Sequence, residues 1–191
     1  MARTTDARER ALETAERLFR AQGYAATGLS QILEESAAPK GSFYHHFPGG
    51  KAQMAEEALS AYARRGDALI AYIAAQAGGD PAVFVRMICD GFATEMERSA
   101  WTLGCMAQNF ANELAPGDPV WTVRLEAVFA AWSRAIGGAL RAGGIDAPRA
   151  DGLAGALLAA IEGARTLART EQSAKPFQRV AEAFVSTLSP Q

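Results

Sequence analysis

The segment that most restricts the fold is 28–47, whose pattern predicts two short helices joined by a tight turn. Ser30 is placed to cap the first helix, and Ile32 and Leu33 give that helix an inward face.

The second helix of this segment begins at Pro39, which suits a first helical position, and ends before Pro48. Phe43 and Phe47 lie four residues apart and are expected to share its buried face. Small residues at its start and donor-rich outward side chains suit insertion into a DNA major groove. The outward side chains are those of Lys40, Ser42, Tyr44 and His45.

These residues resemble the DNA-binding module of TetR/AcrR-type transcriptional regulators. The similarity runs without a gap from Gly23 to Lys51, through Pro-Lys-Gly-Ser-Phe-Tyr-His-His-Phe, and its Pro-Gly-Gly-Lys ending is closest to the LmrA/YxaF-like branch. The resemblance implies an all-α fold of about nine helices. It places a three-helix helix-turn-helix DNA-binding domain at 1–50 and a helical effector-binding and dimerisation domain at 51–191.

Phosphate contacts are expected from side chains near helix starts, from a rigid phenol and from a cation at a helix N-terminus. These side chains resemble the family's phosphate contacts, although Thr27 and Ser30 equally suit ordinary helix capping. They belong to Thr27, Ser30, Tyr44 and Lys51.

Sequence reading is expected from Lys40, which suits guanine N7 and O6, and from His45. Gly41 leaves no side chain between the backbone and the groove. Ser42 suits contact with either a base or a phosphate, and Pro39 starts the helix that carries all of them. Because one short helix makes few contacts, we expect a homodimer that reads two half-sites of double-stranded operator DNA.

Composition and charge are those of an ordinary globular protein, with 49% hydrophobic and 21% charged residues. The net charge of −2 excludes a wholly basic nucleic-acid binder, although residues 1–51 carry +1 and the remainder −3. No apolar run approaches the ~20 residues that span a bilayer, and the charged N-terminus is not a signal peptide. Cys89 and Cys105 have no metal or redox spacing. We therefore expect a cytoplasmic protein without membrane contact, cofactor or bound metal.

Apolar spacing and glycine or proline breaks predict six further helices, at 5–22, 51–76, 81–98, 121–141, 151–169 and 176–188, with a shorter and less regular segment at 101–115. Asp80 is placed to cap the helix that begins at 81. The helix from Lys51 begins at the DNA end and is the expected connector between the two halves. The last two helices suit a four-helix interface between two chains, as the resemblance also implies, or else they close the core of one chain. Their predicted dimer residues are Leu153, Leu157, Ala160, Ala164, Leu167, Phe177, Val180 and Phe184.

The resemblance implies a small-molecule effector pocket in the second half, and aromatic and methionine side chains there suit an apolar or aromatic ligand. The same side chains equally suit an ordinary core. Glu162 and Arg165 either orient a ligand or pair with each other along one helix. The predicted pocket residues are Phe84, Met87, Phe92, Met96, Trp101, Met106, Asn109, Phe110, Trp121, Phe129, Trp132, Glu162 and Arg165.

The interpretation with most support is a repressor that a ligand releases from its operator. An effector-independent regulator, an activator and a helical interaction module remain alternatives on the same fold. An enzyme has no support, because no histidine follows His46 and no catalytic set is present. A redox role for either cysteine stays open beside a core role.

Replacing Lys51 with alanine is expected to weaken binding to all DNA sequences and to flatten the salt dependence by about one unit, because one phosphate contact is lost. Lys40→Ala is expected to relax sequence specificity as well. Titrations against specific and random DNA at several salt concentrations measure both effects. Equal salt slopes for Lys51→Ala and the parent protein would remove Lys51 from the phosphate contacts.

Overall fold

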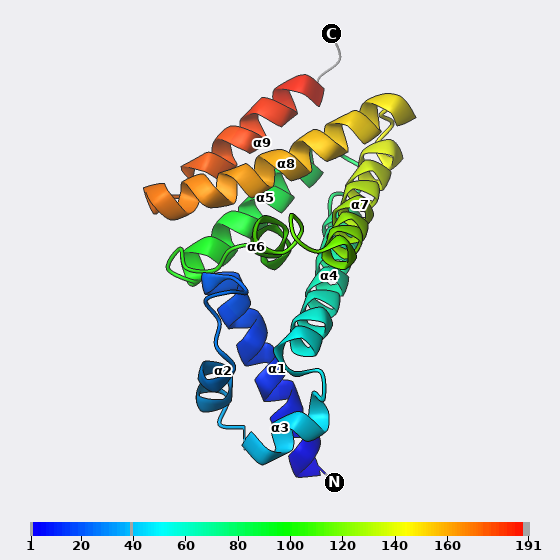
Figure 1. Ribbon diagram of the computed structural model, residues 1–191. Coiled ribbons are helices and arrows are strands. Elements are labelled where there is room, and N and C mark those ends of the chain that lie inside the picture. The colour runs from blue at the N-terminus through cyan, green and yellow to red at the C-terminus, as the bar shows by residue number, and fades with distance from the viewer. Residues whose placement is uncertain (1, 39, 189–191) are drawn as a thin grey trace. The chain divides into compact units, whose positions relative to one another are not determined.

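The computed structural model describes residues 2–38 and 40–188, apart from the side chains of residues 2–6 and of Ser42. The described chain forms nine α-helices and no strand (Figure 1), which confirms the predicted all-α class. The helices are α1 Ala2–Gln22, α2 Leu29–Glu35, α3 Lys40–His46, α4 Gly50–Gln76, α5 Pro81–Arg98, α6 Met106–Glu113, α7 Pro119–Ala142, α8 Ala147–Glu171 and α9 Lys175–Leu188.

Contacts between residues divide the chain into two compact units. Unit 1 comprises residues 1–64 and 106–125, and unit 2 comprises residues 65–105 and 126–191. Helix α6, from the middle of the chain, therefore belongs with the N-terminal helices. A functional boundary after residue 50 is a different kind of division and stays a prediction.

Unit 1 is built around α1, which contacts both α2 and α6. Phe19 of α1 is fully buried, and Phe43 and Phe47 of α3 are 2% and 1% exposed, as their spacing predicted. Phe110 brings α6 into the same core, with its ring centroid 5.2 Å from that of Phe19. Apolar burial thus fixes the two short helices of the motif on α1 and adds α6 to them.

Unit 2 contains a layer in which α9 packs against both α5 and α8 (Figure 1). Phe177 of α9, Ile88 of α5 and Ile161 of α8 are each 1% exposed and belong to this core. In the same unit Gly66 of α4 lies against Trp132 of α7, where a Cβ atom would stand 2.6 Å from the indole nitrogen. A glycine inside a long helix is explained here by close helix packing.

Helix ends agree with the sequence at some positions and differ at others. Asp80 caps α5, its carboxylate accepting the amide hydrogens of Ala82 and Val83 at 2.8 and 3.1 Å. The prediction that Ser30 caps α2 is wrong, because Gly28 is the N-cap residue and makes no side-chain cap bond. Helix α8 begins at Ala147 rather than at 151, since Asp146 caps it.

The less regular segment predicted at 101–115 contains one short helix, α6, which begins at Met106. Ala100 and Trp101 both adopt left-handed backbone angles, with φ of 49° and 63°. Their amide hydrogens bond to the carbonyl oxygens of Glu97 and Met96, which ends α5 in a Schellman arrangement. Helix α5 therefore ends at Arg98, where the predicted helix also ended.

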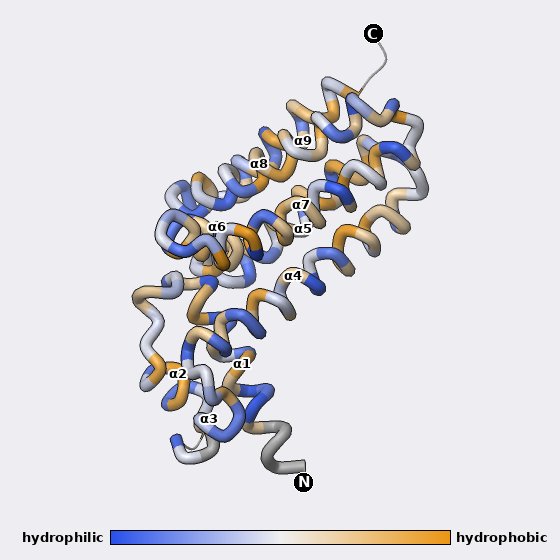
Figure 2. Tube along the Cα trace, turned by 45° about the vertical axis from the view of Figure 1, so that its right-hand side comes forward, coloured by the Kyte–Doolittle hydropathy of each residue, from blue (hydrophilic) through white to orange (hydrophobic). Residues whose placement is uncertain are grey.

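Hydrophobic and hydrophilic residues alternate along the helices in short stretches (Figure 2). Within the described residues, no helix is both long and apolar enough to cross a membrane.

Candidate nucleic-acid interface

The outward face of α2 and α3 carries most of the predicted DNA contacts. The turn between the two helices includes Ala37 at φ 51°, and the buried rings of Phe43 and Phe47 hold α3 from behind. Tyr44 is 54% exposed, and a Cβ atom added at Gly41 would meet no other group within 4 Å. The predicted contacts that lie exposed are Ser30, Lys40, Gly41, Tyr44 and His45.

Four predicted contacts differ from this group: Thr27, Pro39, Ser42 and Lys51. Thr27 is fully buried and its hydroxyl donates to the carbonyl oxygen of Gly23 at 2.6 Å, so the prediction that it donates to a phosphate is corrected. Its hydroxyl instead closes the α1–α2 connection. Pro39 and the side chain of Ser42 lie outside the described residues.

Lys51, in the first turn of α4, is half-buried. Its ammonium group donates to the carbonyl oxygens of Tyr24 and Thr27, both at 3.0 Å, and lies 4.1 Å from the centroid of the Tyr24 ring. Burial lowers the pKa of Lys51, an effect that the nearby Glu113 carboxylate opposes. Two of its three N–H bonds thus hold the α1–α2 connection, and a phosphate contact through the third stays a prediction.

Asn109 was predicted to orient a ligand, but its side-chain amide donates to the last turn of α1. The bonds reach the carbonyl oxygens of Phe19 at 2.9 Å and Arg20 at 3.1 Å. Two other predicted pocket residues, Phe110 and Trp121, stack edge-to-face at 5.3 Å, and Phe110 also contacts Tyr24 at 5.7 Å. These three side chains, with the fully buried Met106, belong to unit 1, where they support the DNA-binding helices.

The remaining predicted pocket residues lie in unit 2. Phe84 and Met96 are 1% and 0% exposed and fill the core, and Trp132 is also buried. Those that keep partial exposure are Met87, Phe92, Trp101, Phe129 and Glu162.

Arg165 is 3% exposed and carries the most buried charge of α8. It pairs with Glu95 of α5 at 3.1 Å, and its guanidinium carbon lies 4.2 Å from the centroid of the Phe92 ring. The bond to Glu95 ties Arg165 to another helix, and a pair with Glu162 at i, i+3 spacing stays a prediction. A charge this deep in unit 2 links α5 to α8.

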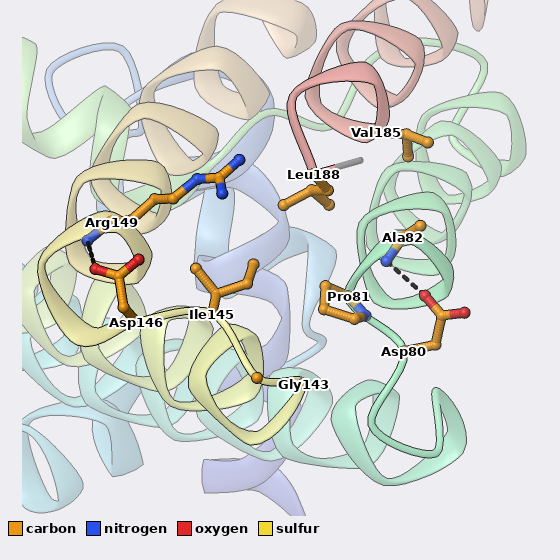
Figure 3. Close-up of a pocket in the computed structure, with 10 residues that line it drawn as sticks. Asp80, Pro81, Ala82, Gly143, Ile145, Asp146, Arg149, Val185 and Leu188 are labelled. Carbon is orange, nitrogen blue, oxygen red and sulfur yellow. Dashed lines mark hydrogen bonds between the residues drawn. The ribbon is translucent and has the colours of Figure 1, made fainter. Parts of the chain in front are cut away.

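A separate hollow of about 350 Å³ opens where α5 and α8 begin and α9 ends (Figure 3). Pro81, Ile145 and Leu188 gather at its centre, while Asp80 and Asp146 stand toward its sides. Both carboxylates already accept backbone hydrogen bonds as helix caps. The residues predicted to line an effector pocket are not among those that line this hollow.

The predicted dimer residues divide by exposure. Leu157, Ala164 and Phe177 are 0%, 3% and 1% exposed within one chain, so they close its core and are corrected as interface residues. Leu167 is 51% exposed. The residues with intermediate exposure are Leu153, Ala160, Val180 and Phe184.

Both cysteines are free and buried. Burial, with a smaller contribution from the charge of Asp90, raises the pKa of Cys89 to about 12. Because the thiolate is the reactive form, Cys89 is a poor redox sensor at neutral pH. In the described part of the chain no group of His, Cys, Asp and Glu side chains could hold a metal ion.

Comparison with known proteins assigns both halves of the chain. Residues 11–58 match the family described as bacterial regulatory proteins of the tetR family, and residues 81–183 match the C-terminal domain of LmrA/YxaF-like transcriptional regulators. The chain is 34% identical over 178 residues to the HTH-type transcriptional regulator YxaF of Bacillus subtilis, which covers 93% of this chain and 92% of YxaF.

Two further similarities agree. The HTH-type transcriptional regulator LmrA of Bacillus subtilis is 62% identical over 55 residues, which are 29% of each chain. The crystal structure of a TetR transcriptional regulator from Legionella pneumophila superposes with a TM-score of 0.85 at 21% identity, covering 95% of this chain and 96% of that one. The latter is a likeness of fold.

Lys51→Met is expected to lower the melting temperature by a few degrees, because two hydrogen bonds from a charged group are lost, together worth about 1–3 kcal/mol. Circular dichroism measures the unfolding, and Lys175→Met, an exposed lysine of α9, is the matched control. The salt slope of DNA binding then separates the two roles of Lys51. An unchanged slope means that Lys51 acts on the connection alone, and a melting temperature equal to that of the control would contradict that role.

Proposed function

This chain belongs to the TetR family of bacterial transcriptional regulators, in the LmrA/YxaF-like branch, and on that premise we propose that it is a homodimeric repressor that a small molecule releases from its operator. A dimer seated on promoter DNA blocks access of other proteins to that DNA, which favours repression. We place its action in the cytoplasm, where bacterial DNA lies, and assign it no catalytic step.

The observation that carries DNA binding is the exposed face of α3, which the buried Phe43 and Phe47 hold in place. We propose that Lys40 and His45 read base edges in the major groove, and that Gly41 lets the backbone approach them. Tyr44 and Ser30 are exposed beside them and are proposed to contact phosphates.

Dimerisation is proposed through the exposed face of α8. Gly152, Gly155 and Gly163 face open space, where an added Cβ atom would meet nothing within 4 Å. Glycine costs about 0.5–1 kcal/mol in a helix interior, and no contact among the described residues offsets that cost here. Close approach of a second copy explains the small residues, with Leu167 at 51% exposure as an apolar contact.

The effector is proposed to bind in unit 2 beside the partly exposed Met87, Phe92, Trp101, Phe129 and Glu162. These side chains suit an apolar or aromatic compound with one hydrogen-bonding group. Such a ligand lowers operator affinity only if it prefers a conformation whose two DNA-binding units no longer fit both half-sites. Helix α4, whose first part belongs to unit 1 and last part to unit 2, is the proposed connector.

Titration of the protein into fluorescent intergenic DNA from beside its own gene is expected to show tight, competitor-resistant binding. The affinity should fall as salt rises, because phosphate contacts release counterions. Anisotropy at two salt concentrations measures this, with random DNA as the control. If neither DNA binds even at low salt, the proposed function is wrong.

Leu167→Glu is expected to give a monomer of 20.2 kDa by light scattering, because two buried carboxylates at a symmetric contact repel each other. Operator affinity should fall about 100-fold or more, since two linked heads bind far more tightly than one. Leu69→Glu, at an exposed leucine of α4, is the matched control and should remain dimeric. A dimeric Leu167→Glu protein with full affinity would contradict an interface on this face of α8.

A further inference from the structure

Helix α6 holds the connection between α1 and α2 with two polar side chains one turn apart, Asn109 and Glu113. The amide of Asn109 donates to the carbonyl oxygens of Phe19 and Arg20 at 2.9 and 3.1 Å. One carboxylate oxygen of Glu113 accepts the amide hydrogen of Tyr24 at 3.1 Å, and the other accepts that of Ala25 at 2.6 Å. We refer to Asn109 and Glu113 as the α6 clamp.

The two side chains of the clamp match the polarity of the backbone that they meet. Carbonyl groups at the end of a helix have no partner within it and carry partial negative charge, so a donor such as Asn109 suits them. The backbone amides just beyond need an acceptor, and Glu113 provides one oxygen to each. A glutamate in place of Asn109 would set a carboxylate against the carbonyl oxygens, where like charges repel.

Gly23 stands between the two sets of bonds and fits the clamp closely. Its φ is +85°, in the left-handed region that favours glycine. A Cβ atom on Gly23 would lie 1.8 Å from a carboxylate oxygen of Glu113, so only glycine lets the carboxylate reach the two amides. The backbone at Gly23 and the side chain of Glu113, 90 residues apart in sequence, are thus sterically complementary.

Helix α4 holds the other polar groups of the same connection. The ammonium group of Lys51 donates to the carbonyl oxygens of Tyr24 and Thr27, while the Glu113 carboxylate accepts the amide hydrogens of Tyr24 and Ala25. Helix α2 begins four residues after Ala25, so the position of α2 on α1 depends on this connection. A small displacement there moves α2 and α3, whose exposed side chains face the groove.

We propose that Asn109 and Glu113 are positioning residues for DNA binding. They do not touch DNA, and they lie more than 50 residues beyond the helix-turn-helix motif. By fixing both sides of the turn at Gly23 they hold α2 and α3 at the angle that operator reading requires. The proposal rests on the operator binding inferred above.

The test uses the full-length protein and four alanine variants, measured well below the melting temperature. Asn109→Ala and Glu113→Ala are each expected to lower operator affinity about tenfold, because a charged or amide hydrogen-bond pair is lost at the turn. Asn112→Ala on the exposed side of α6 and Glu126→Ala on the exposed side of α7 are the matched controls. Removal of an acidic residue by itself favours DNA binding, so a weaker Glu113→Ala protein cannot be explained by charge.

Two further readouts separate positioning from general instability. Binding to random DNA should change little and the salt slope should stay constant, because no phosphate contact is removed. Hydrogen exchange of a peptide covering residues 23–28 should quicken in the clamp variants and not in the controls. Glu113→Gln keeps one acceptor oxygen and should fall between the parent and Glu113→Ala; it also replaces Glu113→Ala if that variant does not fold.

The proposal is overturned if the clamp variants bind operator as tightly as the controls do. It is equally overturned if specific and random binding fall together with unchanged exchange at 23–28. If the parent protein itself binds no operator, the proposed function fails instead, and the exchange rates still report whether the clamp holds the connection.

Discussion

The connection between α1 and α2 is the constraint on which the DNA-binding helices depend. Residues 23–28 join the two helices, and several of their backbone groups bond to side chains of other helices instead of to regular secondary structure. Lys51 of α4 satisfies carbonyl oxygens, Glu113 of α6 satisfies amide hydrogens, and the buried Thr27 hydroxyl closes the loop on Gly23. Helices α4 and α6 must therefore both meet this loop before α2 and α3 are fixed.

The local sequence pattern predicted those structural features that depend only on residues close together in the chain. The spacing of Phe43 and Phe47 predicted that both side chains are buried, and Asp80 before Pro81 predicted the N-cap of α5. Such features follow from helix periodicity and from one backbone bond, which a short stretch of sequence contains. The start of α6 at Met106 could not be located, because the stretch 101–115 shows no regular helical spacing.

Long-range partners could not be predicted in the same way. Asn109 and Phe110 read as pocket residues because they lie in an apolar, irregular stretch, but their partners on α1 are about 90 residues away. The pair of Arg165 with Glu95 joins residues 70 apart on two helices, which no local spacing indicated. In each case tertiary packing decides between several partners that the sequence allows equally.

The composition of unit 1 from residues 1–64 and 106–125 bears on how the chain is made. Proteins are synthesised from the N-terminus, and a contiguous N-terminal domain can fold while the rest is still on the ribosome. Here Phe19 has no Phe110 against it, and the amides of Tyr24 and Ala25 have no acceptor, until α6 has been translated. While α4 and α5 are synthesised, unit 1 of the growing chain is therefore incomplete. We expect DNA binding only after α6 has been translated.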